Sequence, residues 1–339
     1  MTIRKIAAEC GVSAATVDRV LNDRGKVKPE TKMRVLDALA KAGYTKNIAA
    51  RALAIRKAAP VVGVVLSSDG NPFFGEVLRG LRRAEGELAD YGITLRLSTM
   101  RGYNPDRQLA LIAAMESQIS TLVLHPIDHP MIAEKITSLA SKGIPTVTVN
   151  SDIEQTRRIC YVGSDYSTSG KTAAGVIRAA TQGKGRLGIL SGVATLQGHR
   201  QRLNGFETHL QAICPGMEIT ARSSAQDDDE YAYSVARAML RADPMIDTIL
   251  LIAAGLKGVC EAITDLKMDA QIRMFAFDNI PYTRTVMEKG LLKAVVCQQP
   301  FQQGYQAVKV AMSIILSGIP PAEKIYMENQ IRILENLDD

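Results

Sequence analysis

Short β-branched runs alternate with amphipathic helical stretches from Val61 almost to the end of this 339-residue chain, and this alternation constrains the fold most. Nine runs are strand candidates: residues 61–68, 94–99, 121–126, 146–151, 185–192, 218–224, 247–254, 273–279 and 293–299. Regular β–α alternation predicts parallel sheets with helices on both faces. One open sheet of nine or more strands is possible, but we expect two lobes of about five strands each. Ligands bind in such a body at the carboxyl ends of the strands.

A short helical segment precedes this body. Thr2 can begin a first helix, Gly11 supplies a tight turn, and Ser13 can cap a second helix. A third helix fits the stretch from Pro29 to Gly43. Two helices joined by a short glycine turn and followed by a third helix follow the helix-turn-helix plan.

Positive charge is concentrated in this N-terminal segment. Residues 1–57 hold thirteen Lys and Arg against five Asp and Glu, whereas the remainder holds twenty-eight against thirty. The excess predicts a polyanionic partner for the N-terminal segment only. On the second helix, Arg19 is the residue able to bond a guanine edge through two hydrogen bonds. The alternative is a three-helix cap with a solvated basic face.

The fold class expected is α/β, with a helix-turn-helix headpiece on a two-lobed body. The expected regions are a DNA-binding headpiece at 1–45, a linker with a short helix at 46–59, and a body at 60–339 for effector binding and dimerisation. The expected lobes are residues 60–158 plus 283–318, and residues 159–282 plus 319–339.

Several classes of protein are excluded by what the sequence lacks. Five widely separated cysteines without metal-ligand spacing predict buried free thiols in a reducing compartment. The chain opens without a signal peptide and has no apolar stretch long enough to span a bilayer, so we expect a cytoplasmic protein with no membrane partner. Catalytic motifs are missing, and His125, Asp128 and His129 are interpreted as a strand-to-helix loop. We therefore expect no enzyme activity, no metal and no cofactor.

The segment "TIRKIAAECGVSAATVDRVLN" resembles the headpiece of the LacI/GalR family of bacterial transcription regulators, and "NIAARALA" resembles that family's hinge helix. The resemblance extends over essentially the whole chain and implies a body like the type I periplasmic binding proteins. Residues expected to contact DNA are Thr2, Ile3, Arg4, Ser13, Ala14, Ala15, Thr16, Asp18, Arg19, Asn22, Lys26, Asn47, Ala50 and Leu53.

In the hinge, the resemblance implies that Leu53 is an apolar wedge that opens a central base step from the minor groove. Ordinary helix packing against the body is the alternative. Two hinges are needed for this use. The expected active form is therefore a homodimer, or a larger assembly, on a palindromic double-stranded DNA operator.

Asp18 departs from the family pattern, which has serine at this place. A carboxylate near phosphates is repelled. Asp18 could accept from a cytosine amino group, pair with Arg4 or Lys5, or mark the loss of one phosphate contact. We favour the last two interpretations.

Polar side chains follow several predicted strands of the body. Asn150, Asp278 and Gln298 lie at strand ends, and amide and carboxylate groups supply the paired donors and acceptors that polyols need. "NPFF", "TVTVNSD", "GHRQRLNGF", "FAFDN" and "VVCQQP" resemble ribose-type sugar-binding proteins. The residues placed in the cleft are Asn71, Phe73, Phe74, Asn150, Arg200, Arg202, Asp278 and Gln298.

Three details of this cleft stay open. Phe73 and Phe74 could stack on a sugar ring, or pack beneath the next helix. Arg200 and Arg202 point about 200° apart on a helix, so only one should enter the cleft. The sugar-binder likeness favours Arg200, and the repressor pattern favours Arg202. The acidic run at 227–230 could cap a helix or face the ligand.

The sequence thus predicts a ligand-responsive DNA-binding regulator, a repressor of carbohydrate or polyol genes, whose effector is an uncharged monosaccharide or cyclic polyol. One alternative is a transport-associated solute-binding protein. The other is a DNA-binding regulator whose body takes no small molecule.

Overall fold

The computed structural model describes residues 3–21, 27–41, 56–319 and 321–338. The chain divides into two compact units, Met1–Ala54 and Ile55–Asp339. Most of the predicted linker at 46–59, including the hinge residues Asn47, Ala50 and Leu53, lies outside the described residues.

The N-terminal unit is a helix-turn-helix headpiece. It contains α1 (Ile3–Glu9), α2 (Ala14–Leu21) and α3 (Pro29–Lys41). Gly11 adopts a φ of 61° in the turn, a conformation that glycine reaches without strain. Ser13 caps α2, because its Oγ accepts from the backbone N–H of Thr16 at 3.1 Å. Apolar side chains from the three helices form a small core: Ile6, Ala7, Cys10, Val17, Val20, Val35, Ala38 and Leu39.

The body contains two six-stranded sheets with the same strand order. The first sheet runs β11-β5-β4-β3-β1-β2 and is parallel throughout. Its strands are β1 (Val61–Leu66), β2 (Thr94–Thr99), β3 (Thr121–Leu124), β4 (Thr146–Val149), β5 (Cys160–Ser164) and β11 (Lys324–Met327).

The second sheet runs β12-β10-β9-β8-β6-β7, and only its edge strand β12 is antiparallel, pairing with β10. Its strands are β6 (Lys184–Ser191), β7 (Gly216–Ser224), β8 (Thr248–Leu251), β9 (Arg273–Phe277), β10 (Leu292–Cys297) and β12 (Gln330–Arg332). All nine runs expected as strands are confirmed, and so is the division into two sheets.

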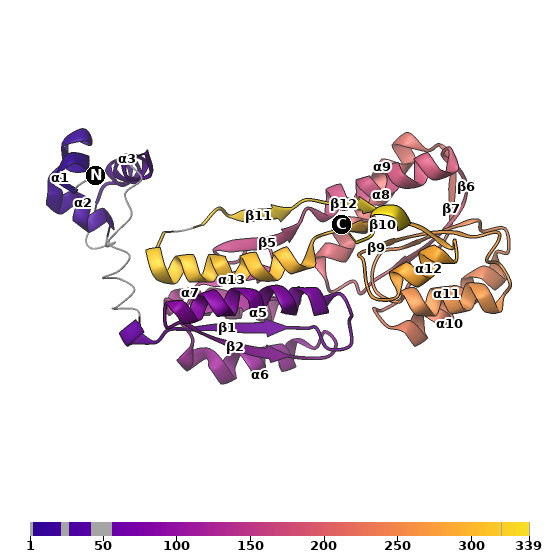
Figure 1. Ribbon diagram of the computed structural model, residues 1–339, viewed down its shortest axis with the longest axis horizontal. Helices are drawn as coiled ribbons and strands as arrows, with labels where there is room; N and C mark the ends of the chain where they lie inside the picture. Colours follow the sequence, from indigo (N-terminus) through magenta and orange to yellow (C-terminus); the bar gives the residue numbers. More distant parts are fainter. Residues whose placement is uncertain (1–2, 22–26, 42–55, 320, 339) are drawn as a thin grey trace. The chain divides into compact units, whose positions relative to one another are not determined.

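Helices cover both faces of each sheet (Figure 1). On the first sheet, α5 (Phe74–Asp90) and α13 (Pro300–Ser317) pack on one face and α6 (Pro105–Met115) and α7 (Pro130–Ser141) on the other. Successive side chains of β1 point to opposite faces of the sheet. Val64 packs against α5 and α13, and Val65 packs against α6 and α7. A short 3₁₀ turn, η1 (Glu116–Gln118), follows α6.

The second sheet has α8 (Tyr166–Thr181) and α9 (Gln197–Ile213) on one face. Its other face is covered by α10 (Asp229–Ala242), α11 (Leu256–Asp265) and α12 (Thr283–Glu288), and η2 (Leu334–Asn336) lies near the C-terminus. Helices α8 and α9 approach closely at Gly170, where an added Cβ would lie 2.1 Å from the carbonyl oxygen of Arg202. This glycine therefore fixes how near α9 lies to the first turns of α8.

The limits expected for the two lobes are wrong at three points. Residues 160–164 pair with β4 and belong to the first lobe, as does β11 at 324–327. Residues 283–297 belong to the second lobe, because β10 pairs with β9. The chain thus crosses between the lobes after β5, after β10 and after β11. The strands β5, β11 and β12 were not predicted from the sequence.

Candidate functional site

A cavity of about 620 Å³, including its opening to solvent, lies at the carboxyl ends of the strands of both lobes. The first lobe contributes Asn71, Phe73, Phe74, Tyr103, His125 and Asn150 to its lining. The second lobe contributes Tyr166, Leu196, His199, Arg202, Asp227, Phe277, Asp278 and several small apolar side chains. Gln298 lies where the chain crosses between the lobes after β10.

Seven of the eight residues predicted for the cleft line this cavity: Asn71, Phe73, Phe74, Asn150, Arg202, Asp278 and Gln298. Arg200 does not, and its prediction is wrong. Its side chain is 47% exposed and pairs with Asp128 outside the cavity. Two residues further along α9, Arg202 points the opposite way and is 2% exposed.

Arg202 is held by one hydrogen bond and two aromatic rings. Its Nη1 donates to the carbonyl oxygen of Ile252 at 2.7 Å. The guanidinium carbon lies 4.0 Å from the ring centroid of Phe277 and 4.8 Å from that of Tyr166. Nε and Nη2 are buried and have no partner within the described part of the chain. These nitrogens form the edge of the guanidinium that can donate two parallel hydrogen bonds.

A buried chain of side-chain hydrogen bonds joins the two lobes beneath the cavity. Gln298 Nε2 donates to Asp278 Oδ2 at 2.8 Å, and Gln303 Nε2 donates to the Gln298 carbonyl oxygen at 2.8 Å. Asn150 Nδ2 then donates to Gln303 Oε1 at 3.1 Å. Burial raises the pKa of Asp278, and the charge of Arg202 and the bonds from Gln298 oppose this. Gln303 was not predicted, because it lies inside a helix rather than at a strand end.

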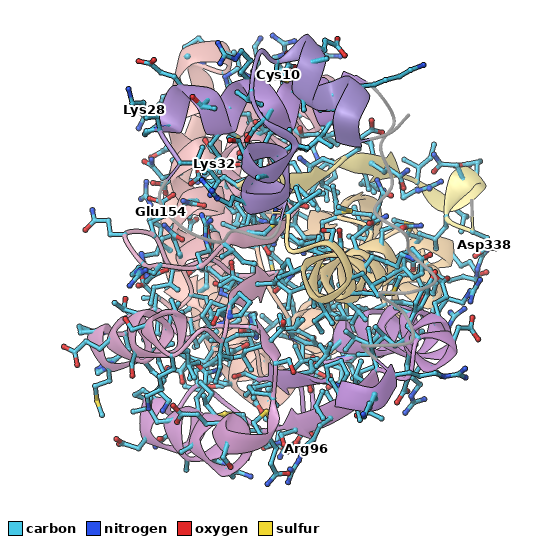
Figure 2. The ribbon with its side chains drawn as sticks, turned by 90° about the vertical axis from the view of Figure 1, so that its left-hand side faces the viewer. Cys10, Lys28, Lys32, Arg96, Glu154 and Asp338 are labelled. Atoms are coloured by element: carbon cyan, nitrogen blue, oxygen red, sulfur yellow. The ribbon has the colours of Figure 1, made fainter. Side chains whose placement is uncertain are left out.

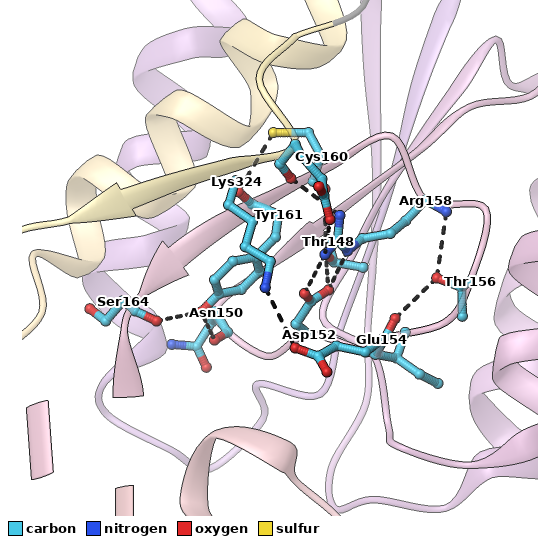
Figure 3. A network of polar contacts seen from close by, with 12 residues as sticks. Thr148, Asn150, Asp152, Glu154, Thr156, Arg158, Cys160, Tyr161, Ser164 and Lys324 are labelled. Atoms are coloured by element: carbon cyan, nitrogen blue, oxygen red, sulfur yellow. Dashed lines mark hydrogen bonds and ion pairs between the residues drawn. The ribbon is translucent and has the colours of Figure 1, made fainter. Parts of the chain in front are cut away.

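A second network fixes the loop that carries Asn150 (Figure 3). Asp152 accepts from Thr148 Oγ1 at 2.7 Å and from Arg158 Nε and Nη2 at 2.6 and 2.7 Å. The Tyr161 hydroxyl donates to the Asn150 carbonyl oxygen at 3.0 Å. These bonds hold Asn150 at a φ of 63°, an uncommon value for a residue other than glycine.

The phenylalanine pair lies between the cavity and the core, so packing beneath the helix is confirmed and stacking on a sugar ring stays a prediction. Phe73 and Phe74 line the cavity, yet both are buried in the core beneath α5 and α13. Their ring centroids are 5.3 Å apart in an edge-to-face arrangement. Asn71 Oδ1 accepts from the backbone N–H of Phe73 at 3.1 Å and so fixes the turn that presents them.

The acidic run at 227–230 also divides its roles. Asp228 caps α10, since its Oδ1 accepts from the backbone N–H of Tyr231 at 2.9 Å. Asp227 lines the cavity and accepts from the Tyr103 hydroxyl at 3.0 Å and from the backbone N–H of Ala254 at 3.2 Å. Burial and the nearby Asp227 carboxylate raise the pKa of Tyr103.

The lobes touch directly at the rim of the cavity. Tyr103 belongs to the first lobe and Asp227 to the second, so their hydrogen bond spans the cleft. Asp128 of the first lobe adds two contacts to the second: its backbone N–H donates to Thr195 O at 3.1 Å, and its carboxylate pairs with Arg200. Arg200 thus joins the lobes instead of facing the cavity.

Among the residues predicted to contact DNA, Ser13 caps α2, Ala14, Ala15 and Thr16 lie in its first turn, and Arg19 lies in its last turn. All five are exposed or half-buried. The helix positions of Ile3, Arg4 and Asp18 are described but their side chains are not, so the role of Asp18 stays open. Thr2, Asn22 and Lys26 lie outside the described residues, as do the hinge positions.

One basic side chain next to the DNA-recognition helices is exposed, as a DNA-binding surface requires. Lys28, at the start of α3, is exposed (Figure 2). Cys10 is buried in the headpiece core, and all five cysteines are buried free thiols, as predicted. Within the described ranges there is no group of three metal-binding side chains and no helix long and apolar enough to cross a bilayer.

Comparisons with known proteins assign both units. Residues 62–318 match the family described as "Periplasmic binding protein domain", and residues 2–47 match "Bacterial regulatory proteins, lacI family". The chain is 29% identical over 327 residues to the ribose operon repressor of Bacillus subtilis (strain 168), covering 93% of this chain and 91% of that protein. It is 22% identical over 273 residues to the D-ribose/D-allose-binding protein of Pseudomonas aeruginosa, covering 78% and 85%.

The body also has the fold of a solved solute-binding protein. GanP, a glucose-galactose binding protein from Geobacillus stearothermophilus, matches with a TM-score of 0.76 at 24% identity, over 82% of this chain and 99% of that one. A periplasmic-binding-protein body therefore follows a regulator headpiece in one polypeptide. The chain belongs over its body to the family of periplasmic binding protein domains, and it carries at its N-terminus the DNA-binding domain of the lacI family of bacterial regulatory proteins.

Proposed function

We propose that this regulator represses genes of carbohydrate or polyol metabolism, binds a palindromic operator as a dimer, and takes an uncharged sugar or cyclic polyol in the cleft as its effector. The observation that carries the proposal is the pairing of a helix-turn-helix headpiece with a cavity walled by unpaired donors, carboxylates and aromatic rings.

The cavity chemistry favours hydroxyl groups. Arg202 offers only donors, through Nε and Nη2, while the carboxylates of Asp227 and Asp278 offer only acceptors. A hydroxyl satisfies both kinds of group, because it donates and accepts at once. Phe73 and Phe74 supply an apolar wall against which a ring face can pack.

A phosphorylated sugar fits this wall poorly. Phosphate sites need a cluster of cations or free backbone N–H groups at a helix start. Within the described lining, Arg202 is the only lysine or arginine, and two carboxylates accompany it. The two negative charges of a phosphate would meet both of them at close range.

The relatives support a role in sugar metabolism. The ribose operon repressor is named for a sugar operon, and a second relative, the HTH-type transcriptional regulator MalR of Streptococcus pneumoniae, is 26% identical over 83% of this chain. A transport-associated solute-binding protein does not account for residues 2–47. A regulator without an effector does not account for the buried, unpaired Arg202 edge.

On the DNA side, we place Arg19 and the start of α2 in the major groove, with Lys26 and Lys28 near phosphates. Leu53 from each of two hinges is the proposed minor-groove wedge, and this requires a dimer. Because its partner is genomic DNA, we place the protein in the cytoplasm.

The test is calorimetry of the full-length protein with D-ribose, D-allose, D-glucose, D-galactose, D-arabinose, myo-inositol and ribose 5-phosphate. At least one uncharged compound should bind and change the affinity for operator DNA. Tighter binding of ribose 5-phosphate than of D-ribose would contradict the proposal, and so would the failure of every uncharged compound to bind.

A further inference from the structure

His125 is a cavity residue that the predicted ligand set does not include. It follows β3 directly, is 1% exposed, and lines the cavity beside Phe74. Neither of its ring nitrogens has a hydrogen-bond partner among the residues that the structure describes. A buried polar group without a partner is rare in a native protein and calls for a specific reason.

Three hydrogen bonds fix the backbone at His125 and at Ile127, two residues later. Its N–H donates to Val65 O at 3.0 Å, and its carbonyl oxygen accepts from Gln108 Nε2 at 2.9 Å. Gln108 is fully buried, and its Oε1 accepts from the backbone N–H of Ile127 at 3.0 Å. Gln108 thus holds the main chain on both sides of the proline that follows His125.

The imidazole itself is held by two rings. Its centroid lies 5.0 Å from that of Phe74 and 6.4 Å from that of Tyr103. Both neighbours also line the cavity. The ring therefore has little freedom to turn toward another partner, and its nitrogens stay at the cavity wall.

Other histidines of the body are used differently. His129 Nδ1 accepts from the backbone N–H of Met131 at 3.3 Å and caps α7. His199 also lines the cavity, but its Nδ1 lies 3.3 Å from the carbonyl oxygen of Val193. A structural role with a protein partner is thus available for these two and is missing for His125.

His125 is also neutral at the pH of a cell. Burial, and to a lesser degree the nearby His199, lower its pKa to about 3. A neutral imidazole carries one N–H donor and one nitrogen acceptor at a fixed angle. This combination matches a hydroxyl pair better than it matches a carboxylate or an ammonium group.

We propose that His125 is a specificity-determining residue of the cleft, which donates to one hydroxyl oxygen of the effector through one ring nitrogen and accepts from a neighbouring hydroxyl through the other. This inference rests on the proposed function, because it assumes that a polyhydroxyl compound occupies the cavity. Gln108 is the positioning residue that holds His125 in place.

The experiment uses His125→Leu, which keeps a similar volume and removes both nitrogens, and His125→Gln, which keeps a donor and an acceptor. His209→Leu is the matched control, since His209 is half-buried on α9 and outside the cavity lining. Each full-length protein is titrated by calorimetry with the compound that binds the unmodified protein most tightly among D-ribose, D-allose, D-glucose, D-galactose, D-arabinose and myo-inositol. The same titrations are repeated with each monodeoxy form of that compound.

We expect His125→Leu to bind the parent compound at least about tenfold more weakly, His125→Gln to recover part of the loss, and His209→Leu to bind normally. The unmodified protein should lose affinity when the one or two hydroxyls read by His125 are removed, and His125→Leu should no longer distinguish those deoxy forms from the parent. The melting temperature of ligand-free His125→Leu should equal or exceed that of the unmodified protein, because no protein partner is lost.

Two results would overturn the inference while leaving the proposed function intact. One is normal affinity of His125→Leu for the parent compound. The other is a weakened affinity that falls equally for every deoxy form together with a lower melting temperature, which would assign His125 a purely structural role. If no compound binds the unmodified protein, the proposed function fails first and this inference fails with it.

Discussion

Asn150 and Asp278 occupy equivalent positions in the two lobes. Each follows the strand that comes fourth in chain order within its sheet, β4 for Asn150 and β9 for Asp278, and their φ values are 63° and 65°. The backbone N–H of Asn150 donates to Val162 O at 2.9 Å, and that of Asp278 donates to Val296 O at 3.1 Å. The repeated topology therefore brings the same backbone turn to both walls of the cavity, with a neutral amide on one and a carboxylate on the other.

Asp278→Ala should abolish detectable effector binding and leave operator binding largely intact. A carboxylate accepts from two neighbouring hydroxyls, and leaving each of them unpaired costs about 1–3 kcal/mol. Calorimetry with the best-binding sugar and a gel shift with operator DNA measure the two effects separately. Asp265→Ala is the control, because it removes an exposed carboxylate of the same lobe outside the cavity. Normal effector affinity of Asp278→Ala would contradict the assignment.

Much of this site could be predicted because parallel strands end at a common edge. Asn150, Asp278 and Gln298 were found by that rule alone, and the motif resemblance added Asn71 and the two phenylalanines. Asp227 belongs to the acidic run whose role was left open, and Tyr103 was missed, because a loop has no periodicity that says where a side chain points. His125 directly follows β3 but was interpreted as part of a strand-to-helix loop. The choice between Arg200 and Arg202 depended on the rotation of α9 about its axis. That rotation is fixed by contacts such as Gly170 against Arg202, which pattern alone does not give.

Arg202→Gln and Arg200→Ala should separate ligand contact from contact between the lobes. Arg202→Gln removes the free Nε and Nη2 edge and should weaken effector binding by about a hundredfold or more, since charged hydrogen bonds contribute about 1.5–3 kcal/mol. Arg200→Ala removes a half-exposed pair with Asp128 and an exposed hydrogen bond to the Ala194 carbonyl oxygen, so its effect should stay within about fivefold. Calorimetry measures the loss of effector affinity in each variant. A larger loss for Arg200→Ala than for Arg202→Gln would show that Arg200, not Arg202, contacts the effector.

The stability of the body should fall in acid partly because of His125. Its pKa is about 3 in the folded protein and about 6.5 in an unfolded chain, so the unfolded state binds more protons between these values. The stabilisation is therefore present above about pH 6.5 and is lost as the pH falls toward about 3. Between about pH 7 and about pH 5 the contribution lost is about 2 kcal/mol.

Urea unfolding of the unmodified protein and of His125→Leu at these two pH values measures this contribution as the difference between their losses. His209→Leu should follow the unmodified protein. Parallel profiles for the unmodified protein and His125→Leu would show that His125 does not titrate as a buried neutral group.

Arg158→Met should destabilise the body without changing which sugar it prefers. It leaves the Asp152 carboxylate buried with only Thr148 as a side-chain partner, and breaking one side of a buried pair costs about 3–5 kcal/mol. Thermal unfolding measures the loss. Arg157→Met is the matched control, because Arg157 is the exposed neighbour. Removing Asp152 as well, as Asp152→Leu with Arg158→Met, should recover much of the loss, and failure to recover it would point to a role for Asp152 beyond pairing.

Leu53→Ala should weaken binding to the operator far more than binding to unrelated DNA. Leu53 lies outside the described residues, and its proposed role follows from an isolated leucine in a hinge segment that also carries Arg51, Arg56 and Lys57. An apolar wedge is useful only at a central base step that unstacks easily, so its loss removes specific affinity, whereas contacts with phosphates remain on any sequence. Gel shifts at one fixed salt concentration, with operator and unrelated duplexes of equal length, compare the two affinities. Effector binding measured on the same protein preparation verifies that the body is intact. An equal loss on both duplexes would assign Leu53 to packing against the body and remove the wedge from the mechanism.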